Sequence, residues 1–435
     1  LFSEISHLET GIVFKYDLSG KIIDRYKINT NFNSKIFKGE SFKKSSQIVG
    51  HLLKESISKQ TIADKKVGLF LSSGLDSSLI FSYLMGMKYK LDFALTLIWK
   101  PFMNSNDFQK PEYEAKLLTS DLSYKKHLEI TPPSRIRGLE KILSYMVIEG
   151  LTDPAALSTY YLSKKARNLG CKVMLCGQGA DEICYGYRRH KVIPLYFLIS
   201  KFRPLNSYAY EKILRFIKIP YIHRIVRKLI KLLSLVGLSK KAFLKNIYSL
   251  GSDSLISKFI QNFEPSSLDI ELKNLKTDNL ISHETIEYLD TKFDLKSLNL
   301  RYADRMGMAS SIEIRVPFLS NNLVKYIHSI PVYYKYRFFE CKRILREISK
   351  KLLPSFIIRR SKTGFTFPLE EMLMQEKDFI IKLINKENAI FNKYFDNKYL
   401  RYYFDSFYKG EYINTQMLFS LISIKICFDD LYLQK

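Results

Sequence analysis

Three short apolar segments alternate with helical segments in this chain, and the alternation constrains the fold more than any other feature. The apolar segments cover residues 67–72, 91–99 and 172–176. Segments that are apolar throughout are typical of strands covered on both faces, as in parallel sheets. The segments between them predict crossover helices at residues 77–87, 112–122 and 158–168. The sequence therefore predicts an α/β fold with a parallel sheet and flanking helices.

The rest of the chain gives simpler patterns. Residues 12–28 alternate apolar and polar side chains on both sides of Asp17-Leu18-Ser19-Gly20, which predicts a β-hairpin. Residues 46–58 predict one amphipathic helix. From about residue 253 onward the spacing is mostly helical, with no further convincing run of strands.

Composition excludes several classes of protein. A chain of 435 residues with 46% hydrophobic residues can bury a large core, so it is neither disordered nor dependent on disulfides. No apolar stretch reaches about 18 residues, so we expect no membrane insertion. The five cysteines are an odd number without a CxxC pair, which indicates a reducing compartment, favours the cytoplasm and argues against a thiolate zinc site.

The formal net charge of +26 would attract nucleic acid, anionic membranes or phosphorylated substrates. Residues 191–250 hold 13 Lys and Arg but a single acid, Glu211, with apolar residues at helical spacing. This segment can be a helix that contacts a membrane surface or RNA. It can equally be an amphipathic helical insertion whose exposed face is basic, and we favour the insertion because basic amphipathicity alone is a weak motif.

The loop after the first predicted strand carries the first candidate site, Leu71-Ser72-Ser73-Gly74-Leu75-Asp76-Ser77-Ser78. Small residues before a helix let backbone N–H groups converge on an anion, and serine hydroxyls can donate more hydrogen bonds. Asp76 would repel a phosphate unless it holds Mg²⁺. An ordinary Ser/Asp helix N-cap explains the segment as well.

A second loop follows the third predicted strand, Cys176-Gly177-Gln178-Gly179-Ala180-Asp181-Glu182. Its glycines allow close approach of a ligand, and Asp181 and Glu182 should lie at the same sheet edge as Asp76. Two carboxylates from adjacent strand ends form a natural Mg²⁺ site when phosphates supply the other ligands. The alternative is a loop of solvated acids.

Several ordered blocks resemble a known family. SSGLDSS is similar to the SGGxDS pyrophosphate-binding loop of the N-type ATP pyrophosphatases, except that Ser73 replaces the first glycine and would be costly if its backbone were left-handed. With CGQGADE, GYRR, ADRMGMA, EIRVPFL and RSKTGF, the match over about residues 50–375 resembles the synthetase domain of glutamine-hydrolysing asparagine synthetases. Residues 8–28 resemble the last hairpin of that family's amino-terminal glutaminase domain.

The resemblance implies an adenine nucleotide α-hydrolase-like (PP-loop) fold with a largely helical C-terminal part. Residues 1–35 would be a remnant of the glutaminase domain. Residues 45–435 would form the asparagine synthetase-like domain, with the basic insertion at about 191–250. The first residue is Leu1 rather than Met, so we expect a truncated chain.

The resemblance also implies the chemistry: ATP and Mg²⁺ as cofactors, a carboxylate activated as acyl-AMP, and ammonia that displaces AMP to form an amide. Mg²⁺ would be held by Asp76 and Asp181, and Lys362 would neutralise charge on the phosphates. Arg315 would support the cleft. The pyrophosphate would be held by Ser72, Gly74, Asp76, Ser77 and Ser78, and the adenosine by Leu71, Leu95, Cys176 and Gly177.

Departures from the family pattern concern the acceptor. Gln178 stands where the family commonly has Glu in a position linked to adenylate formation, and an amide can orient a substrate but cannot act as a general base. Ser320 replaces the Asp after VPFL, and residues 153–156 lack the Arg and Thr of aspartate-specific members. The acceptor can therefore be aspartate, a sugar acid or another small carboxylate.

Three other functions would each explain some features of the sequence. A relative of β-lactam synthetases would have Tyr at the position of Gln178. A tRNA-modifying pyrophosphatase or another nucleic-acid-binding protein would explain the charge, but the RVPFL and GYRR blocks argue against nucleic acid as a partner. A catalytically inactive family member would explain Ser73 and Gln178. The expected partners are a carboxylate substrate and a glutaminase domain or other ammonia source, and a homodimer is left open.

Overall fold

The computed structural model describes most of the chain. It covers residue 8 and residues 11–28, 36–99, 114–120, 122, 124–133, 135–196, 235–275, 280–360, 367–411 and 413–432.

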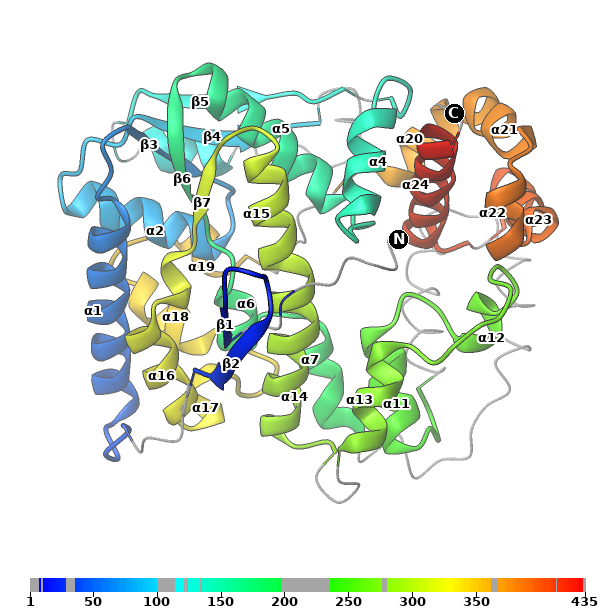
Figure 1. The fold of residues 1–435 in the computed structure, drawn as a ribbon. Coiled ribbons are helices and arrows are strands. Elements are labelled where there is room, and N and C mark those ends of the chain that lie inside the picture. The colour runs from blue at the N-terminus through cyan, green and yellow to red at the C-terminus, as the bar shows by residue number, and fades with distance from the viewer. Residues whose placement is uncertain are drawn as a thin grey trace.

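The described residues contain one five-stranded sheet, in which all strands are parallel and the order is β5-β4-β3-β6-β7 (Figure 1). The strands are β3 (Lys66–Phe70), β4 (Phe93–Leu97), β5 (His127–Ile130), β6 (Cys171–Leu175) and β7 (Glu313–Arg315). The three predicted strands are confirmed as β3, β4 and β6. The α/β fold with a parallel sheet is therefore confirmed.

The two edge strands were not predicted. β5 has four residues that are half-buried except for Ile130, so it lacks the fully apolar pattern of a central strand. β7 has only three residues and pairs with β6 through Val173–Glu313 to Leu175–Arg315. The described residues after 253 are mostly helical, as the sequence predicts. Residues 313–315 are extended because they pair with β6, which the local sequence does not predict.

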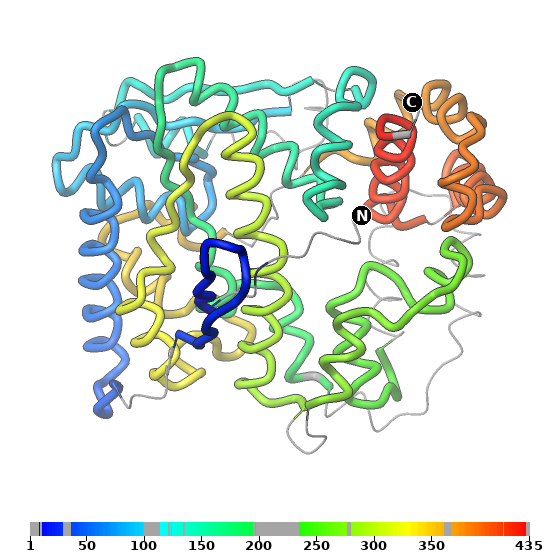
Figure 2. Tube along the Cα trace, viewed as in Figure 1, coloured from blue at the N-terminus to red at the C-terminus, as the bar shows by residue number. Residues whose placement is uncertain are grey.

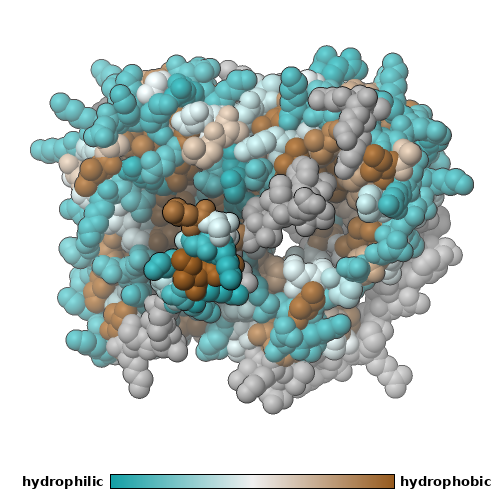
Figure 3. All heavy atoms as spheres, viewed as in Figure 1, coloured by the Kyte–Doolittle hydropathy of each residue, from teal (hydrophilic) through white to brown (hydrophobic). Residues whose placement is uncertain are grey.

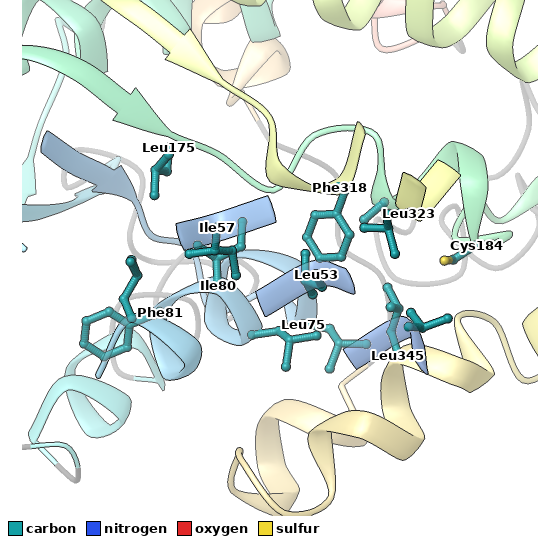
Figure 4. Packing of buried hydrophobic residues seen from close by; sticks show 14 of the residues in the cluster. Leu53, Ile57, Leu75, Ile80, Phe81, Leu175, Cys184, Phe318, Leu323 and Leu345 are labelled. Carbon is teal, nitrogen blue, oxygen red and sulfur yellow. The ribbon is translucent and has the colours of Figure 1, made fainter. Parts of the chain in front are cut away.

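Both faces of the sheet are covered by helices. Val173 and Leu175 belong to an apolar cluster shared with α1 (Phe42–Gln60), α2 (Leu75–Gly86), α16 (Asn321–Ser329) and α18 (Arg343–Ser349). Met174, between them in sequence, points to the other face, where α5 (Ala155–Asn168) packs. This alternation follows from the two-residue period of a strand. Figure 4 shows the first cluster, with Leu53, Ile57 and Ile80 packed beside Phe318.

The helices around the sheet match their sequence signals. The predicted helix 46–58 is confirmed within α1, where Val49, Leu53 and Ile57 form one buried stripe and Ser41 caps the N-terminus. The predicted helices 77–87 and 158–168 are confirmed as α2 and α5. The third is confirmed in part, because residues 114–120 are helical.

A second helical group lies to the right of the sheet in Figure 1, where α24 packs against α4. Its core includes Met146, Leu418 and Ile422. The group contains α4 (Glu140–Ile148), α20 (Leu369–Gln375), α21 (Lys377–Asn385), α22 (Ala389–Tyr394), α23 (Asn397–Tyr408) and α24 (Thr415–Tyr432). None of the helices in the described residues is both long and apolar enough to cross a membrane.

The remaining helices lie mostly below the sheet and the second helical group in the view of Figure 2, in the green to amber parts of the tube. They are α6 (Ala180–Ile183), α7 (Arg189–Val192), η2 (Ile193–Leu195), α11 (Lys240–Tyr248), α12 (Asp253–Ile256), α13 (Ser267–Asn274), α14 (His283–Leu289), the π-helix η3 (Asp290–Asn299), α15 (Leu300–Met308), η4 (Pro317–Leu319), α17 (Val332–Lys335) and α19 (Ser355–Ile358). Within the predicted basic insertion, residues 197–234 lie outside the described residues, and α11 confirms a helix near its end.

The predicted N-terminal hairpin is confirmed as β1 (Ile12–Tyr16) and β2 (Ile22–Lys27), which pair antiparallel. Every residue of β2 is exposed, including the apolar Ile22, Ile23 and Tyr26. Figure 3 shows hydrophobic side chains gathered on the part of the hairpin that is turned to the viewer.

Candidate active site

The two predicted ligand-binding loops meet at the point where the sheet order reverses. β3 lies between β4 and β6, so the chain first adds a strand on one side of β3 and later returns to add β6 on the other. Open α/β sheets bind ligands outside the carboxyl ends of their strands at such a point. A β-carbon added at Gly177 would stand 2.9 Å from Asp76 Cβ and 3.0 Å from the Ser77 nitrogen, so the loops after β3 and β6 touch.

The loop after β3 is held by its own serine hydroxyls. The Ser77 and Ser78 hydroxyls donate to the Ser72 carbonyl at 2.8 and 3.3 Å, and the Ser72 N–H donates to Ser77 Oγ at 3.0 Å. The Gly74 N–H donates to Ser72 Oγ at 3.2 Å. These bonds fix the loop at the N-terminus of α2, where the first N–H groups of a helix have no partner within the helix and favour an anion.

Ser73 fits this loop without backbone strain. It is buried, with 1% of its surface exposed, and it is not among the residues with a left-handed backbone. The extra β-carbon, relative to the glycine of the family pattern, is therefore accommodated without the cost of a positive φ.

The two predicted acidic residues converge on a lysine. Lys342 Nζ lies 2.5 Å from Asp76 Oδ2 and 2.6 Å from Asp181 Oδ1. All three side chains are largely buried, with 6% of Lys342, 14% of Asp76 and 13% of Asp181 exposed. The segments that carry them come from three distant parts of the sequence and meet at the end of the sheet.

A buried hydrophobic cluster next to this site packs the three segments together. Leu75 precedes Asp76, Cys184 follows Asp181 by one turn, and Leu345 follows Lys342 by one turn. These three apolar residues belong to one buried cluster, in which Figure 4 labels each of them. Side chains that stand on a close-packed core have little freedom to move apart.

Gly186 makes room for the charged pair. A β-carbon added there would lie 1.9 Å from Asp181 Oδ1 and 2.3 Å from Lys342 Cε. The Lys342 N–H also donates to the Cys184 carbonyl at 3.2 Å. The lysine stem therefore passes directly over a position where no side chain larger than hydrogen fits.

The charges in this site stabilise one another. Burial, the largest single influence, lowers the pKa of Lys342, but the charges of Asp181 and Asp76 and their hydrogen bonds outweigh it, and the pKa is raised above its usual value. Lys342 is therefore an ammonium at neutral pH, and two carboxylates share its single positive charge. The ammonium and the two carboxylates form one buried charged group at the end of the sheet.

The residues present fit Mg²⁺. Mg²⁺ prefers carboxylate oxygens and is commonly bound by one or two carboxylates, with phosphates and water completing the shell. Asp76 and Asp181 supply two such groups, each with one oxygen within 2.6 Å of the same atom, Lys342 Nζ. No cluster of three or more His, Cys, Asp or Glu that could hold a metal occurs among the described residues, so a substrate or water would supply the further ligands.

Glu182, next to Asp181, lies in a buried polar network. Tyr187 Oη donates to Glu182 Oε1 at 2.8 Å, and Asn299 Nδ2 donates to the same oxygen at 2.5 Å. Burial, followed by the charge of Asp181, raises the pKa of Glu182. Asn299 is the last residue of the π-helix η3, a conformation that is rare and often occurs at functional sites.

The first residues of η3 continue the network. Asp290 accepts from Arg189 and from Tyr248 Oη, each at 2.6 Å, and lies 2.6 Å from His190 Nε2. Asp294 forms a second ion pair with Arg189. The GYRR block is thus anchored to the π-helix by its last arginine, which fixes the end of the loop that carries Asp181.

Gln178 lies beside the site in a fixed orientation. Its Oε1 accepts from Cys176 Sγ at 3.5 Å, and its amide lies close enough to Tyr302 to lower the pKa of that phenol, against the larger raising effects of burial and of the Asp153 charge. Burial raises the pKa of Cys176 to about 12, so the thiol remains protonated and can donate. An amide held in this way can orient a bound group but cannot accept a proton from it.

Asp153, in the segment that departs from aspartate-specific members, has a structural task. Its Oδ1 accepts from the Ala155 N–H at 2.8 Å at the start of α5, and its Oδ2 accepts from Gln416 Nε2 at 3.2 Å. Burial raises the pKa of Asp153, and its charge raises the pKa of Tyr302. Asp153 and Gln178 therefore both influence the Tyr302 hydroxyl.

The residues predicted to contact adenosine lie side by side at the strand ends. The Leu71 N–H donates to the Leu95 carbonyl at 2.9 Å, and the Cys176 N–H donates to the Arg315 carbonyl at 2.9 Å. The side chains of Leu71 and Leu95 are buried in the core on opposite faces of the sheet. A nucleotide would therefore meet these two residues through their backbone atoms.

Two further predicted residues have different outcomes. Lys362 lies outside the described residues. Arg315 Nη1 donates to the carbonyls of Gln60 and Ile62 at 2.8 and 2.7 Å, which ties β7 to the end of α1. Arg315 therefore has a structural role beside the sheet, and its support of the cleft stays a prediction.

Sequence reasoning missed Lys342, Tyr302 and Asn299. Lys342 is 266 positions from Asp76, and its surroundings, Cys341-Lys342-Arg343-Ile344-Leu345, are typical of an ordinary helix start. Tyr302 and Asn299 lie just before the ADRMGMA block. They are three residues apart, so a helix would place both on one surface, and this spacing could have identified them as candidate site residues.

Comparison with known proteins identifies relatives of this chain. The family described as asparagine synthase matches residues 49–429. The asparagine synthetase [glutamine-hydrolyzing] 1 of Bacillus subtilis is 25% identical over 406 residues, which cover 89% of this chain and 59% of that protein. Asparagine synthetase [glutamine-hydrolyzing] 2 of the same organism is 26% identical over 324 residues, 73% of this chain and 38% of that protein.

The chain is thus shorter than the proteins it matches. It spans 55 to 59% of the length of the relatives with the longest matches. The matched family segment includes both loops, Gly186, the π-helix and Lys342.

Proposed function

This chain belongs to the asparagine synthase family, and from that premise we propose that it is an ATP-dependent amide-forming ligase. A carboxylate oxygen of the substrate attacks the α-phosphorus of ATP, the bond to the β-phosphate oxygen breaks, and pyrophosphate leaves. Ammonia then attacks the acyl carbon of the acyl-AMP and AMP departs with the electron pair of the broken bond. The products are an amide, AMP and pyrophosphate.

The convergence of Asp76 and Asp181 at the switch point is the observation that supports this proposal most. These two carboxylates would hold Mg²⁺, which when bound neutralises charge on the phosphates of ATP. The first N–H groups of α2, at Leu75, Asp76 and Ser77, would orient the departing pyrophosphate. Lys362, carried over from the family pattern, would add a positive charge.

Gln178 and Tyr302 would orient the acceptor carboxylate. Gln178 lies close to Tyr302 and just before the helix that carries Asp181, so the acceptor would lie beside the metal-binding carboxylates. Aspartate or a related acid is the proposed acceptor. Ammonia would come from glutamine through a glutaminase domain, of which residues 1–35 would be the last part.

ATP–pyrophosphate exchange tests the proposal. We expect label from pyrophosphate to enter ATP only when a suitable carboxylate is present, with aspartate, other amino acids and sugar acids tested in parallel. Asp76→Asn removes one charge from the metal site and should reduce the exchange rate by at least about a hundredfold, since charge stabilisation of this kind is worth several kcal/mol. Asp405→Asn, at an exposed position on α23, is the matched control and should retain full activity.

The exchange assay also separates the alternatives. Near-normal exchange by Asp76→Asn would contradict the metal role. Absence of exchange with every carboxylate, in a chain that still binds ATP, would favour an inactive family member, the alternative for which Gln178 is the specific observation.

A further inference from the structure

Lys342 occupies the position between the two aspartates that the proposed function assigns to a divalent cation. Its Nζ lies within 2.6 Å of one oxygen from each carboxylate. A metal ion bound by the same two oxygens and an ammonium at this place exclude each other, both by volume and by like-charge repulsion. One of the two cations has to leave before the other can bind.

The lysine is fixed in this place by its backbone as well as its charge. Lys342 has a left-handed backbone with φ of 54°, which is unfavourable for a residue with a β-carbon, and its carbonyl begins α18 by accepting from the Arg346 N–H at 2.9 Å. Phe338 and Phe339 also have positive φ, in a tight turn closed by two bonds between Arg337 and Glu340. Strain of this kind persists where the surroundings over-determine the conformation, and it is common at functional sites.

The stem of the lysine passes through a space shaped for it. Gly186 leaves room only for Asp181 Oδ1 and Lys342 Cε, as the short distances to an added β-carbon indicate. The ammonium is therefore not a surface side chain that happens to reach an acid. It is buried, anchored at the head of a helix, and in contact with both carboxylates.

We propose that Lys342 is the resident counter-ion of the Asp76–Asp181 site and keeps divalent cations out until a nucleotide arrives. This inference rests on the proposed function, because ATP is the ligand whose phosphates offer the ammonium other anionic partners. The metal then enters together with the nucleotide, and both aspartates exchange Lys342 for the metal. Free metal binds the resting site poorly, so binding is ordered.

Binding of Mn²⁺, followed by electron paramagnetic resonance, tests the order without any measurement of activity. We expect the wild-type chain to bind Mn²⁺ only weakly at this site without nucleotide, and to bind one Mn²⁺ with α,β-methylene-ATP, which cannot be cleaved at the reacting bond. Lys342→Met removes the charge and should bind Mn²⁺ without nucleotide at least about tenfold more tightly than wild type, since a like charge in contact is removed. The double variant Asp76→Asn/Lys342→Met should lose this new site.

A second variant is needed in case Lys342→Met does not fold, because removing one partner of a buried ion pair is strongly destabilising. Lys342→Gln retains hydrogen-bond donors for the carboxylates but carries no charge. Mn²⁺ should raise the melting temperature of Lys342→Gln and leave that of wild type unchanged. Lys342→Arg keeps the positive charge and should, like wild type, bind Mn²⁺ poorly without nucleotide.

The outcomes distinguish this inference from the proposed function. If wild type without nucleotide binds Mn²⁺ as tightly as Lys342→Met and Lys342→Gln, the counter-ion role is wrong, although nucleotide binding can still stand. If wild type does not bind α,β-methylene-ATP with or without Mn²⁺, the proposed function fails and the inference fails with it.

Discussion

Gly186 shows how closely single residues are fitted in this site. It is the third residue after Ile183 at the end of α6, and its lack of a side chain lets Asp181 and Lys342 meet above it. No conformational demand explains the glycine, because its φ is not in the left-handed region. The requirement is one of space.

We therefore expect Gly186→Ala to disrupt the charged site. The new methyl group would have to displace Asp181 Oδ1 and Lys342 Cε, and overpacking of this kind typically costs about 1–3 kcal/mol. The melting temperature should fall, and the affinity for ATP, measured by calorimetry, should fall at least about tenfold because the metal ligand moves.

Gly86→Ala is the control for this prediction. Gly86 ends α2, and an added β-carbon there meets no atom within 4 Å. Alanine favours a helix over glycine by up to about 1 kcal/mol, so this variant should keep its ATP affinity and be as stable as wild type or slightly more so. Full ATP affinity in Gly186→Ala would mean that the pair tolerates rearrangement and that the packing argument is wrong.

At the residue scale, the sequence predicts some partners and not others. Asp76 and Asp181 could be placed together because both follow strands of one parallel sheet. Lys342 could not be placed with them, because it follows no strand and reaches the site from the head of α18. Only the packing of α18 on α2, which no local pattern predicts, brings the lysine to the two aspartates.

At the scale of elements, the π-helix η3 concentrates acidic groups in the interior. Burial raises the pKa of Asp294 to about 7, the attraction of Arg189 opposes this shift, and the charges of Asp290 and Glu182 add to it. No local pattern in residues 290–299 distinguishes a π-helix from an α-helix. Its wider turn is explained by the polar partners on both sides, Arg189 at the start and Glu182 at the end.

This network predicts a pH dependence of stability. An unfolded aspartate titrates near pH 4, so between about pH 4 and 7 the folded chain retains a proton on Asp294 that the unfolded chain has released. The free energy of unfolding therefore falls as the pH rises through this window, by at most about 4 kcal/mol from this group. Asp294→Asn cannot ionise, so the variant should gain stability relative to wild type from pH 5 to pH 8.

Thermal denaturation at several pH values measures this difference. Asp304→Asn, whose side chain is 64% exposed in wild type, should follow the wild-type pH profile. A constant difference between Asp294→Asn and wild type across the range would show that Asp294 is ionised throughout and that its burial is compensated by Arg189.

The central strands of the sheet could be predicted from local sequence, and the edge strands could not. β3, β4 and β6 were predictable because central strands are apolar on both faces. β5 and β7 lie at the edges, where half-buried or exposed positions such as His127 and Glu313 suffice, and their extended form depends on the neighbouring strand. The predicted helices α1, α2 and α5 differ from the observed ones only at their ends, which are the least determined part of any helix.

At the scale of the whole molecule, the parallel sheet and the helical C-terminal part follow from the sequence, while their relative placement does not. The apolar residues of α24 predict a buried helix, but its main contact is with α4, which lies in the first half of the chain. Local patterns carry no information about such a pairing. The charge of the whole chain is likewise a property of the sequence that the fold does not explain.

The net charge of +26 predicts weak and unspecific binding of RNA rather than a role in RNA modification. A protein whose binding depends on phosphate neutralisation loses affinity steeply as the salt concentration rises, by about 10³-fold or more between 50 and 200 mM salt when several contacts are involved. We expect tRNA retained on filters at low salt to be displaced by heparin and lost at higher salt. ATP–pyrophosphate exchange should be the same with and without tRNA. Salt-resistant binding of tRNA, together with tRNA-dependent ATP turnover, would instead favour the tRNA-modifying alternative over an amide-forming ligase.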